Sequence, residues 1–231
     1  MLAFAVCVGS EEKYRLYAQQ GIEFAAEPDS VVAEVTTDRS IFEAYNEVLD
    51  ALADADGLEA LVLLHEDAEI IDAEFCAKVR RRLADPSVAV VGVIGGREVP
   101  GLAWWKGEQH GRVIETRGPI DRGGGLHDVD AVDGLMLVLS PWAVRELRFD
   151  TDNFTGFHGY DADICFQARA AGKRVVVDEI ALIHHTKGGL GDEREYYATD
   201  RVFREKWGLP PREGAVGPGS AGAEALRAAA R

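Results

Sequence analysis

The stretch SIFEAYNEVLDALADADGLEALVLLHEDAEI (residues 40–70) joins a helix pattern to a strand pattern and decides the fold class. Ser40 and Glu43 have the spacing of a helix capping box, and apolar side chains recur on one face of residues 41–52. The apolar run at residues 60–64 is typical of a strand buried on both faces, as in parallel sheets that helices cover. This stretch therefore predicts a helix-to-strand unit of an α/β protein.

The same alternation continues on both sides of this stretch. Each helix pattern is followed by an apolar strand pattern, which predicts a mostly parallel, doubly wound sheet with right-handed crossovers and helices on both faces. The expected segments are strand 2–9, helix 11–21 ended by Gly21, strand 30–35, helix 40–57 ended by Gly57, strand 59–70, helix 72–86 and strand 88–96.

The pattern changes after residue 96. Residues 97–130 are rich in glycine and polar residues, and they predict a long irregular excursion with one short hairpin. Proline, glycine and alanine dominate from Leu209 onward, which predicts a flexible tail. Between them we expect strand 129–139, helix 141–147, helix 161–171 ended by Gly172, strands 174–178 and 181–185, and helix 192–208.

The charge of the chain limits its partners. Its 231 residues carry a formal net charge of −15. Such a charge repels nucleic-acid phosphates and anionic membrane surfaces, so neither is expected as a partner. An anionic ligand would need a local offset, and a bound divalent cation supplies one.

The cysteines and the apolar segments indicate the compartment. Three cysteines lie far apart without a CxxC pair, so they predict neither a disulfide framework nor a zinc site, and a cytoplasmic location fits best. No segment reaches the roughly 18 apolar residues of a membrane-spanning helix. We interpret the apolar N-terminus as a buried strand rather than a signal peptide.

Polar side chains end the strand within residues 59–70. Ligands of open parallel sheets bind beyond the carboxyl ends of the strands. On an extended chain His65 and Asp67 point the same way and Glu66 points opposite. One imidazole and one carboxylate on the same side suit Mn²⁺ or Mg²⁺, with the imidazole favouring Mn²⁺. The alternative is a polar strand end at which Asp67 makes a turn bond.

Two acidic residues, Asp161 and Asp163, lie where the loop GFHGY becomes a helix. Asp161 fits the N-cap position, and Asp163 fits a first-turn acid favoured by the helix dipole. The glycine- and aromatic-rich loop before Asp161 is of the kind that lines a site, so this carboxylate is also a candidate general base. Because a helix start lowers the pKa of a carboxylate, we expect a weak base.

Two adjacent histidines, His184 and His185, end a late strand and precede the sequence TKGG. Alternation places the two imidazoles on opposite faces, so at most one faces a site. The loop that follows is a candidate lid, in which Lys187 pairs with a phosphate.

The order of these features resembles the family 2 glycosyltransferases of the GT-A fold, especially the bacterial branch known as a glycosyltransferase-like domain. The motifs that carry the resemblance are AYNEVLDAL, LVLLHEDAEI, VVGVIGG, DAVDGLMLV and GFHGYDADICFQARAAGKRVVV…IHH, within residues 3–207. The resemblance implies one GT-A-type domain over residues 1–207. Its halves are a nucleotide-sugar-binding part (1–96) and an acceptor-side part (97–207), before a tail (208–231).

The resemblance also implies roles for single residues. The family's Asp-x-Asp motif, which holds a divalent cation against the donor diphosphate, falls on His65-Glu66-Asp67, so Asp67 is the firmer metal residue and His65 replaces the first aspartate. A late histidine closes the metal site, for which we favour His184 over His185. The family's acidic pair falls on Tyr160-Asp161, which leaves Asp161 as the base.

The donor and acceptor contacts that the resemblance implies lie on both halves. Trp104 and Trp105 are candidates for stacking on sugar faces, and core packing is an equally good interpretation of this pair. The expected nucleotide-sugar-binding residues are Val8, Gly9, Ser10, Asp133, Gly134 and Lys187, and the expected sugar-stacking residues are Trp105, Phe157 and Tyr160.

The predicted function is metal-assisted, inverting transfer of a sugar from a nucleotide-diphosphate sugar to an acceptor hydroxyl, with Asp161 as base. The acceptor class stays open between a glycan, a lipid-linked molecule and a small molecule. The main alternative is a non-catalytic nucleotide-sugar or glycan-binding module on the same fold. A nucleotidyltransferase is disfavoured because GSEEKYR after the first strand has one glycine and two glutamates instead of a glycine-rich basic loop. An oxidoreductase is disfavoured because no GxGxxG follows that strand.

Overall fold

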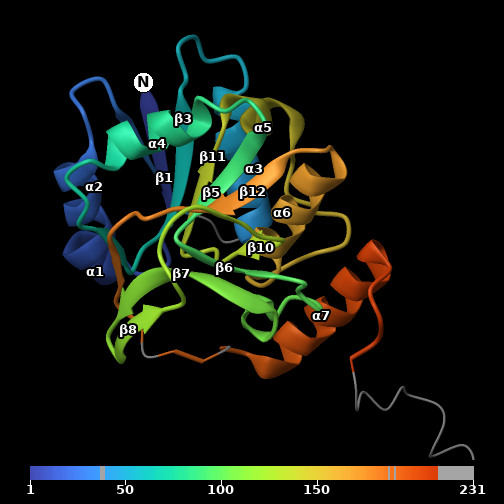
Figure 1. The fold of residues 1–231 in the computed structure, drawn as a ribbon. Coiled ribbons are helices and arrows are strands. Elements are labelled where there is room, and N and C mark those ends of the chain that lie inside the picture. Colours follow the sequence, from blue (N-terminus) through green and yellow to red (C-terminus); the bar gives the residue numbers. More distant parts are fainter. Residues whose placement is uncertain (37–39, 187, 190, 213–231) are drawn as a thin grey trace, which may run out of the picture.

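The structure is a computed structural model, and it describes residues 1–36, 40–186, 188–189 and 191–212. Two sheets and the helices around them make up this part of the chain (Figure 1). The predicted tail, residues 208–231, lies mostly outside the described residues, and the division of the domain at residue 96 stays a prediction.

The central sheet has seven strands in the order β2-β1-β3-β11-β5-β12-β9. β1, β2 and β3 are parallel, as are β5 and β12, while β11 runs antiparallel to β3 and β5, and β9 antiparallel to β12. The prediction of a mostly parallel sheet is confirmed. The strands are β1 (Leu2–Cys7), β2 (Val31–Val35), β3 (Ala60–His65), β5 (Val88–Gly92), β9 (His127–Asp128), β11 (Met136–Leu139) and β12 (Arg174–Val177).

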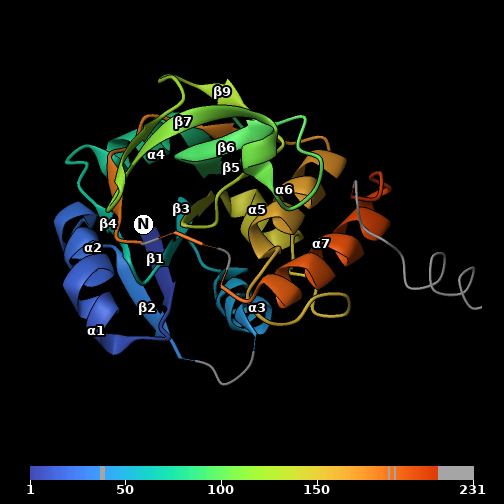
Figure 2. The same ribbon diagram turned by 90° about the horizontal axis from the view of Figure 1, so that it is seen from below.

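Helices cover both faces of the central sheet (Figure 2). The Phe4 and Phe75 rings, 5.8 Å apart, join β1 to α4 on the face that also carries α1 and α2. The Tyr45 and Tyr160 rings, 5.7 Å apart, join α3 to α6 on the other face, beside α5. The helices are α1 (Glu11–Lys13), the π-helix η1 (Tyr14–Ala18), α2 (Gln19–Ala25), α3 (Ile41–Leu52), α4 (Phe75–Leu83), α5 (Pro141–Glu146), α6 (Tyr160–Ala170) and α7 (Glu193–Trp207).

A second sheet lies across the carboxyl ends of the central strands, with α7 beside it (Figure 1). Its order is β10-β6-β7-β13-β4, and β8 pairs with β7 as the predicted hairpin. This sheet closes over the edge where ligands of parallel sheets bind. Its elements are β4 (Ala68–Ile70), β6 (Ile94–Arg97), β7 (Glu108–Glu115), β8 (Gly118–Asp121), β10 (Ala131–Val132) and β13 (Leu182–His184), with the 3-10 turn η2 (Trp104–Lys106) between β6 and β7.

The prediction of one strand over residues 88–96 is wrong. The chain divides at Val93 into β5 in the central sheet and β6 in the second sheet. Glycines allow this crossing, because a Cβ at Gly92 would lie 2.6 Å from the Val132 Cβ, and one at Gly95 would lie 2.4 Å from the Ala131 carbonyl oxygen. A strand pattern cannot show which sheet its residues join, because that depends on β10, some 35 residues further on.

Two predicted helix ends are also wrong. Helix α3 ends at Leu52, well before Gly57. Helix α2 passes through Gly21 and ends at Ala25. Gly21 does not stop the helix but lets it approach β4, since a Cβ there would lie 2.3 Å from the Ile70 backbone nitrogen.

We therefore expect Gly21→Ala to destabilise the protein although alanine is the better helix former. The clash is with backbone, which cannot rotate away, so the free energy of unfolding should fall by about 1–3 kcal/mol. Thermal unfolding followed by circular dichroism measures this change. Gln20→Ala, on the exposed side of the same helix, is the control and should change stability by less than about 0.5 kcal/mol. Equal stability of Gly21→Ala and the control would contradict the close approach.

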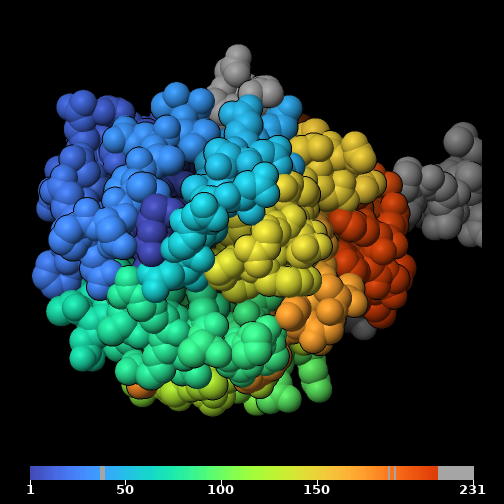
Figure 3. Space-filling view, turned by 90° about the horizontal axis from the view of Figure 1, so that it is seen from above, coloured from blue at the N-terminus to red at the C-terminus, as the bar shows by residue number. Residues whose placement is uncertain are grey.

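The end of the molecule at which β1 begins lies opposite the second sheet (Figure 1), and it is the face seen in Figure 3. There the amino group of Met1 donates to the Gly57 carbonyl oxygen at 3.0 Å and to Glu59 at 2.8 Å. Within the described residues, no helix combines the length and the apolar character that crossing a membrane requires.

Candidate functional site

A cleft of about 560 Å³ lies between the carboxyl ends of the central strands and the second sheet. Residues from both predicted halves of the domain line it, among them Gly9, Asp67, Asp133, Asp161 and His184. The cleft therefore lies at the edge of the sheet at which the sequence predicted a site.

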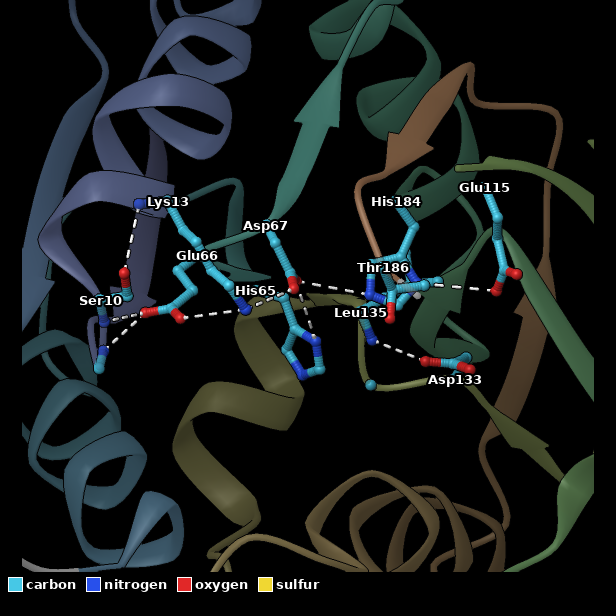
Figure 4. A network of polar contacts seen from close by, with 12 residues as sticks. Ser10, Lys13, His65, Glu66, Asp67, Glu115, Asp133, Leu135, His184 and Thr186 are labelled. Atoms are coloured by element: carbon cyan, nitrogen blue, oxygen red, sulfur yellow. Dashed lines mark hydrogen bonds and ion pairs between the residues drawn. The ribbon is translucent and has the colours of Figure 1, made fainter. Parts of the chain in front are cut away.

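Three potential metal ligands meet in this cleft (Figure 4). Asp67 Oδ1 lies 3.5 Å from His184 Nε2 and 4.0 Å from His65 Nδ1, and the possible ligand atoms all lie within 4.8 Å of one another. Strand pairing explains the meeting, because β13 runs antiparallel to β4 and places His184 opposite Ala68. We call these three residues, His65, Asp67 and His184, the ligand group.

A hydrogen-bond chain sets the tautomer of His65. The Tyr160 hydroxyl donates to the Gly134 carbonyl oxygen at 2.9 Å and lies 2.6 Å from His65 Nε2. Since that hydroxyl has only one proton, Nε2 must carry a proton of its own and donate it. Nδ1 then offers its lone pair toward Asp67. Burial, followed by the neighbouring His184, lowers the pKa of His65 to about 4, so the imidazole is neutral at neutral pH, as a metal ligand must be.

His184 carries a buried nitrogen that lacks a partner. Its Nε2 faces Asp67, while Nδ1 is buried without a hydrogen bond among the described residues, 3.9 Å from Glu115 Oε1. Burial opposes the charged form of His184, but the carboxylates of Asp67 and Asp133 outweigh it and raise the pKa. Two imidazole nitrogens and one carboxylate oxygen fit Mn²⁺ well, whereas Mg²⁺ prefers oxygen ligands.

His185 belongs to the surrounding structure rather than to the ligand group. Its ring stacks on Tyr17 with centroids 3.8 Å apart, and its Nε2 lies 2.7 Å from Glu69 Oε2. Of the two adjacent histidines, the structure thus brings His184 to Asp67, which is the choice made from the sequence.

Asp161 lies in the same cleft, but not as the expected helix cap. Gly159, with φ 92°, is the N-cap of α6. Asp161 Oδ2 accepts from the Gly134 N–H at 3.0 Å, and Oδ1 accepts from the Ala162 N–H at 2.9 Å. Burial and then the nearby Asp133 raise the pKa of Asp161 to about 7, although both hydrogen bonds oppose the rise. The expectation of a weak base is therefore wrong, because burial outweighs the helix start, and this carboxylate is poised for proton transfer near neutral pH.

Asp163, by contrast, is structural. It is 1% exposed and faces away from the cleft. Lys206 Nζ and Trp207 Nε1 donate to its two carboxylate oxygens at 2.9 and 2.8 Å. These bonds anchor the first turn of α6 to the end of α7.

The sequence suggested that Tyr160 stacks on a sugar, but in the structure its ring is buried and its hydroxyl supports the site. Its side chain is only 3% exposed. A Cβ at Gly134 would lie 2.2 Å from the Tyr160 hydroxyl oxygen, so only glycine admits this contact. The peptide groups of Gly134 thus connect Asp161, through the N–H, with His65, through the carbonyl and Tyr160.

The turn after β1 is held by a residue to which the sequence gave no role. Glu66 Oε2 accepts from the backbone N–H groups of Gly9 and Ser10 at 2.7 and 2.6 Å. Gly9 lines the cleft, whereas Val8 is only 9% exposed. The parallel pairing of β1 with β3, in which Cys7 lies opposite His65, brings this turn to Glu66, and alternation alone could not show that contact.

Aromatic side chains form one wall of the cleft. Trp105 and Phe157 are 38% and 50% exposed, whereas Trp104 is 8% exposed and packs in the core. His158 and Tyr196 complete this wall. The sequence did not single these two out, because nothing in the pattern of α7 places Tyr196 near Trp105. Lys187, the predicted phosphate contact, lies outside the described residues.

Comparison with known proteins agrees with this architecture. The sequence matches the family described as "Glycosyltransferase like family" over residues 3–206. The streptomycin biosynthesis protein StrF of Streptomyces griseus is 34% identical over 222 residues, which cover 92% of this chain and 77% of StrF.

Two solved structures show the same fold at low sequence identity. The mannosyltransferase PcManGT from Pyrobaculum calidifontis, in complex with GDP-Man and Mn²⁺, is similar with a TM-score of 0.55 and 15% identity, over 99% of this chain and 78% of that one. GalNAc-T7 with UDP, GalNAc and Mn²⁺ is similar with a TM-score of 0.60 and 10% identity, over 87% of this chain and 47% of that one. The chain belongs to the glycosyltransferase-like family, as a transferase on the GT-A fold.

Proposed function

We propose that this enzyme transfers a sugar from a nucleotide-diphosphate sugar to an acceptor hydroxyl, with inversion at the anomeric carbon and with Mn²⁺ or Mg²⁺ as cofactor. One observation carries the proposal: a ligand group and a carboxylate with a pKa near neutrality share a single cleft and are joined through Gly134. The solved relatives that hold a nucleotide or nucleotide sugar together with Mn²⁺ support it.

The ligand group would hold the cation, which offsets the charge that develops on the diphosphate leaving group. Asp67 supplies the charged ligand. Burial opposes its ionisation, but contacts with His184 and Lys13 outweigh burial and lower its pKa, so Asp67 is ionised at neutral pH. Tyr160 keeps the Nδ1 lone pair of His65 directed at Asp67.

Asp161 would act as the general base. It takes the proton of the acceptor hydroxyl while the acceptor oxygen bonds to the anomeric carbon and the bond from that carbon to the diphosphate oxygen breaks. Attack in line with the leaving group inverts the anomeric centre. The backbone N–H groups of Gly134 and Ala162 hold the two Asp161 oxygens in place, and each oxygen keeps a lone pair with which it could accept the proton.

Trp105 and Phe157 are the candidates for stacking on the sugars, because both rings are exposed in the wall of the cleft. Asp133 and Gly134 line the same cleft and are the candidates for holding the donor sugar. The acceptor is a glycan, a lipid-linked molecule or a small molecule, and we propose a cytoplasmic location.

A panel of UDP-, GDP- and dTDP-sugars, titrated calorimetrically with and without Mn²⁺, tests the donor site. We expect micromolar binding of one nucleotide class, and only with Mn²⁺. Incubation of that donor with candidate acceptors and analysis of the anomeric configuration of the product then test transfer and inversion. Binding without turnover of any acceptor would favour the non-catalytic binding module, and an absence of binding throughout would contradict the donor site.

A further inference from the structure

The ammonium group of Lys13 pairs with the carboxylate of Asp67 in this structure (Figure 4). Its Nζ lies 3.2 Å from Asp67 Oδ2 and 3.8 Å from Glu66 Oε1. It reaches there from the first turn of the helical segment after β1, whose start Ser10 caps and Glu66 holds. A cation of the protein itself thus pairs with the carboxylate of the ligand group.

Lys13 is also isolated as a positive charge. Among the described residues that line the cleft it is the only lysine or arginine, whereas four carboxylates line the same cleft, those of Glu66, Asp67, Asp133 and Asp161. A diphosphate entering here meets a strongly negative surface. One divalent cation, already shared with Asp67, leaves negative charge on the phosphates that a second cation would offset.

We propose that Lys13 exchanges partners during donor binding: it pairs with Asp67 before the divalent cation binds, and it pairs with the donor diphosphate afterwards. The proposal rests on the proposed function, since it assumes a nucleotide-diphosphate donor. A divalent cation bound to Asp67 would repel the Lys13 ammonium group and take over the carboxylate with which it pairs. The Lys13 side chain is 49% exposed, so it is free to turn toward the nearest new anion, a phosphate held by that same cation.

The exchange predicts opposite effects of one substitution on two ligands. Lys13→Gln removes the competitor for Asp67, so Mn²⁺ alone should bind about threefold more tightly. The same variant loses a phosphate contact, so the nucleotide that the wild type binds, UDP, GDP or dTDP, should bind the Mn²⁺-saturated protein about tenfold more weakly. A residue that merely supports the fold would not strengthen one ligand and weaken the other.

Mn²⁺ binding is measured from the electron paramagnetic resonance of the free ion, and nucleotide binding by calorimetry at saturating Mn²⁺. Arg15→Gln is the matched control, because it removes the same charge from a neighbouring position whose guanidinium pairs with Glu11 and does not line the cleft. It should leave both affinities within about twofold of the wild type. Lys13→Arg keeps the charge and should keep most of the nucleotide affinity.

A separate result would overturn each half of the proposed exchange. Mn²⁺ affinity that Lys13→Gln leaves unchanged or weakens would overturn the competition for Asp67, and unchanged nucleotide affinity would overturn the phosphate contact. A wild-type protein that binds none of UDP, GDP and dTDP with Mn²⁺ would overturn the proposed function and this proposal together. Wild-type binding that Lys13→Gln does not alter overturns the exchange alone.

Discussion

Asp161→Asn is expected to lower kcat about a thousandfold and to leave donor binding within about threefold of the wild type. A positioned general base contributes roughly 10²–10⁴-fold to a rate, and asparagine keeps the shape of the side chain while it cannot accept the proton. The asparagine oxygen can still accept from the Gly134 N–H, whereas the Ala162 N–H at the start of α6 loses its side-chain acceptor. Steady-state kinetics with donor and acceptor, and calorimetry with the donor nucleotide and Mn²⁺, separate the two effects.

The pH dependence of the wild-type enzyme checks the same assignment. The base acts only when ionised, and burial together with Asp133 raises its pKa to about 7. The value of kcat/KM should therefore rise about tenfold per pH unit on the acidic side and level off above the pKa. A cation on the ligand group favours the ionised carboxylate, so increasing Mn²⁺ should move the midpoint to lower pH.

Asp163→Asn is the matched control for Asp161→Asn. Asp163 lies in the same turn of α6 as Asp161, but its carboxylate faces Lys206 and Trp207 instead of the cleft. We expect Asp163→Asn to lower stability, because Lys206 loses a buried partner, while kcat per folded molecule stays near the wild-type value. A normal kcat for Asp161→Asn, or an acidic limb that persists in that variant, would show that another group is the base.

Asp67→Asn is expected to weaken the binding of Mn²⁺ by at least about 100-fold, and with it the binding of the donor nucleotide. Asp67 is the only charged ligand of the group, and even residues that merely orient metal ligands contribute 10–100-fold to metal affinity. His65 and His184 keep their positions, since β3 and β13 hold them independently of the Asp67 charge. Electron paramagnetic resonance of Mn²⁺ and calorimetry with the nucleotide measure the two affinities.

Glu69→Gln is the control for Asp67→Asn. It removes one carboxylate two residues further on, where Glu69 pairs with His185 outside the ligand group. Both affinities should stay within about threefold of the wild type, as expected for a charge that only acts at a distance. Metal and nucleotide binding that tolerate Asp67→Asn as well as Glu69→Gln would refute the ligand group.

Local patterns predicted the elements whose causes are local. The capping box of Ser40 and Glu43 is present at the start of α3. The apolar run before His65 is the buried strand β3. The expected strand 59–70 nevertheless breaks after His65, where Glu66 and Asp67 form a turn that keeps Asp67 beside His65. These features depend on hydrogen bonds and side-chain directions within a few residues, so a sequence window contains them entirely.

Wrong predictions arose where a distant segment decides the outcome. Gly21 reads as a helix end, yet it is needed because β4 passes close to α2. Tyr160 reads as an exposed aromatic beside a site, yet Gly134 and His65 engage its hydroxyl. Asp161 reads as a helix cap of low pKa, yet burial beneath the second sheet raises its pKa to about 7.

The sequence by itself determined the α/β class, the edge of the sheet at which the cleft lies, and the residue types available there. Alternation and strand ends are properties of the chain alone. Only the tertiary structure decided that His184 joins Asp67, that Lys13 pairs with it, and that Asp161 has the pKa of a base. The geometry of a ligand group and the desolvation of a carboxylate depend on which segments of the chain pack together. Asp67 and His184, for example, come from segments more than a hundred residues apart in the sequence.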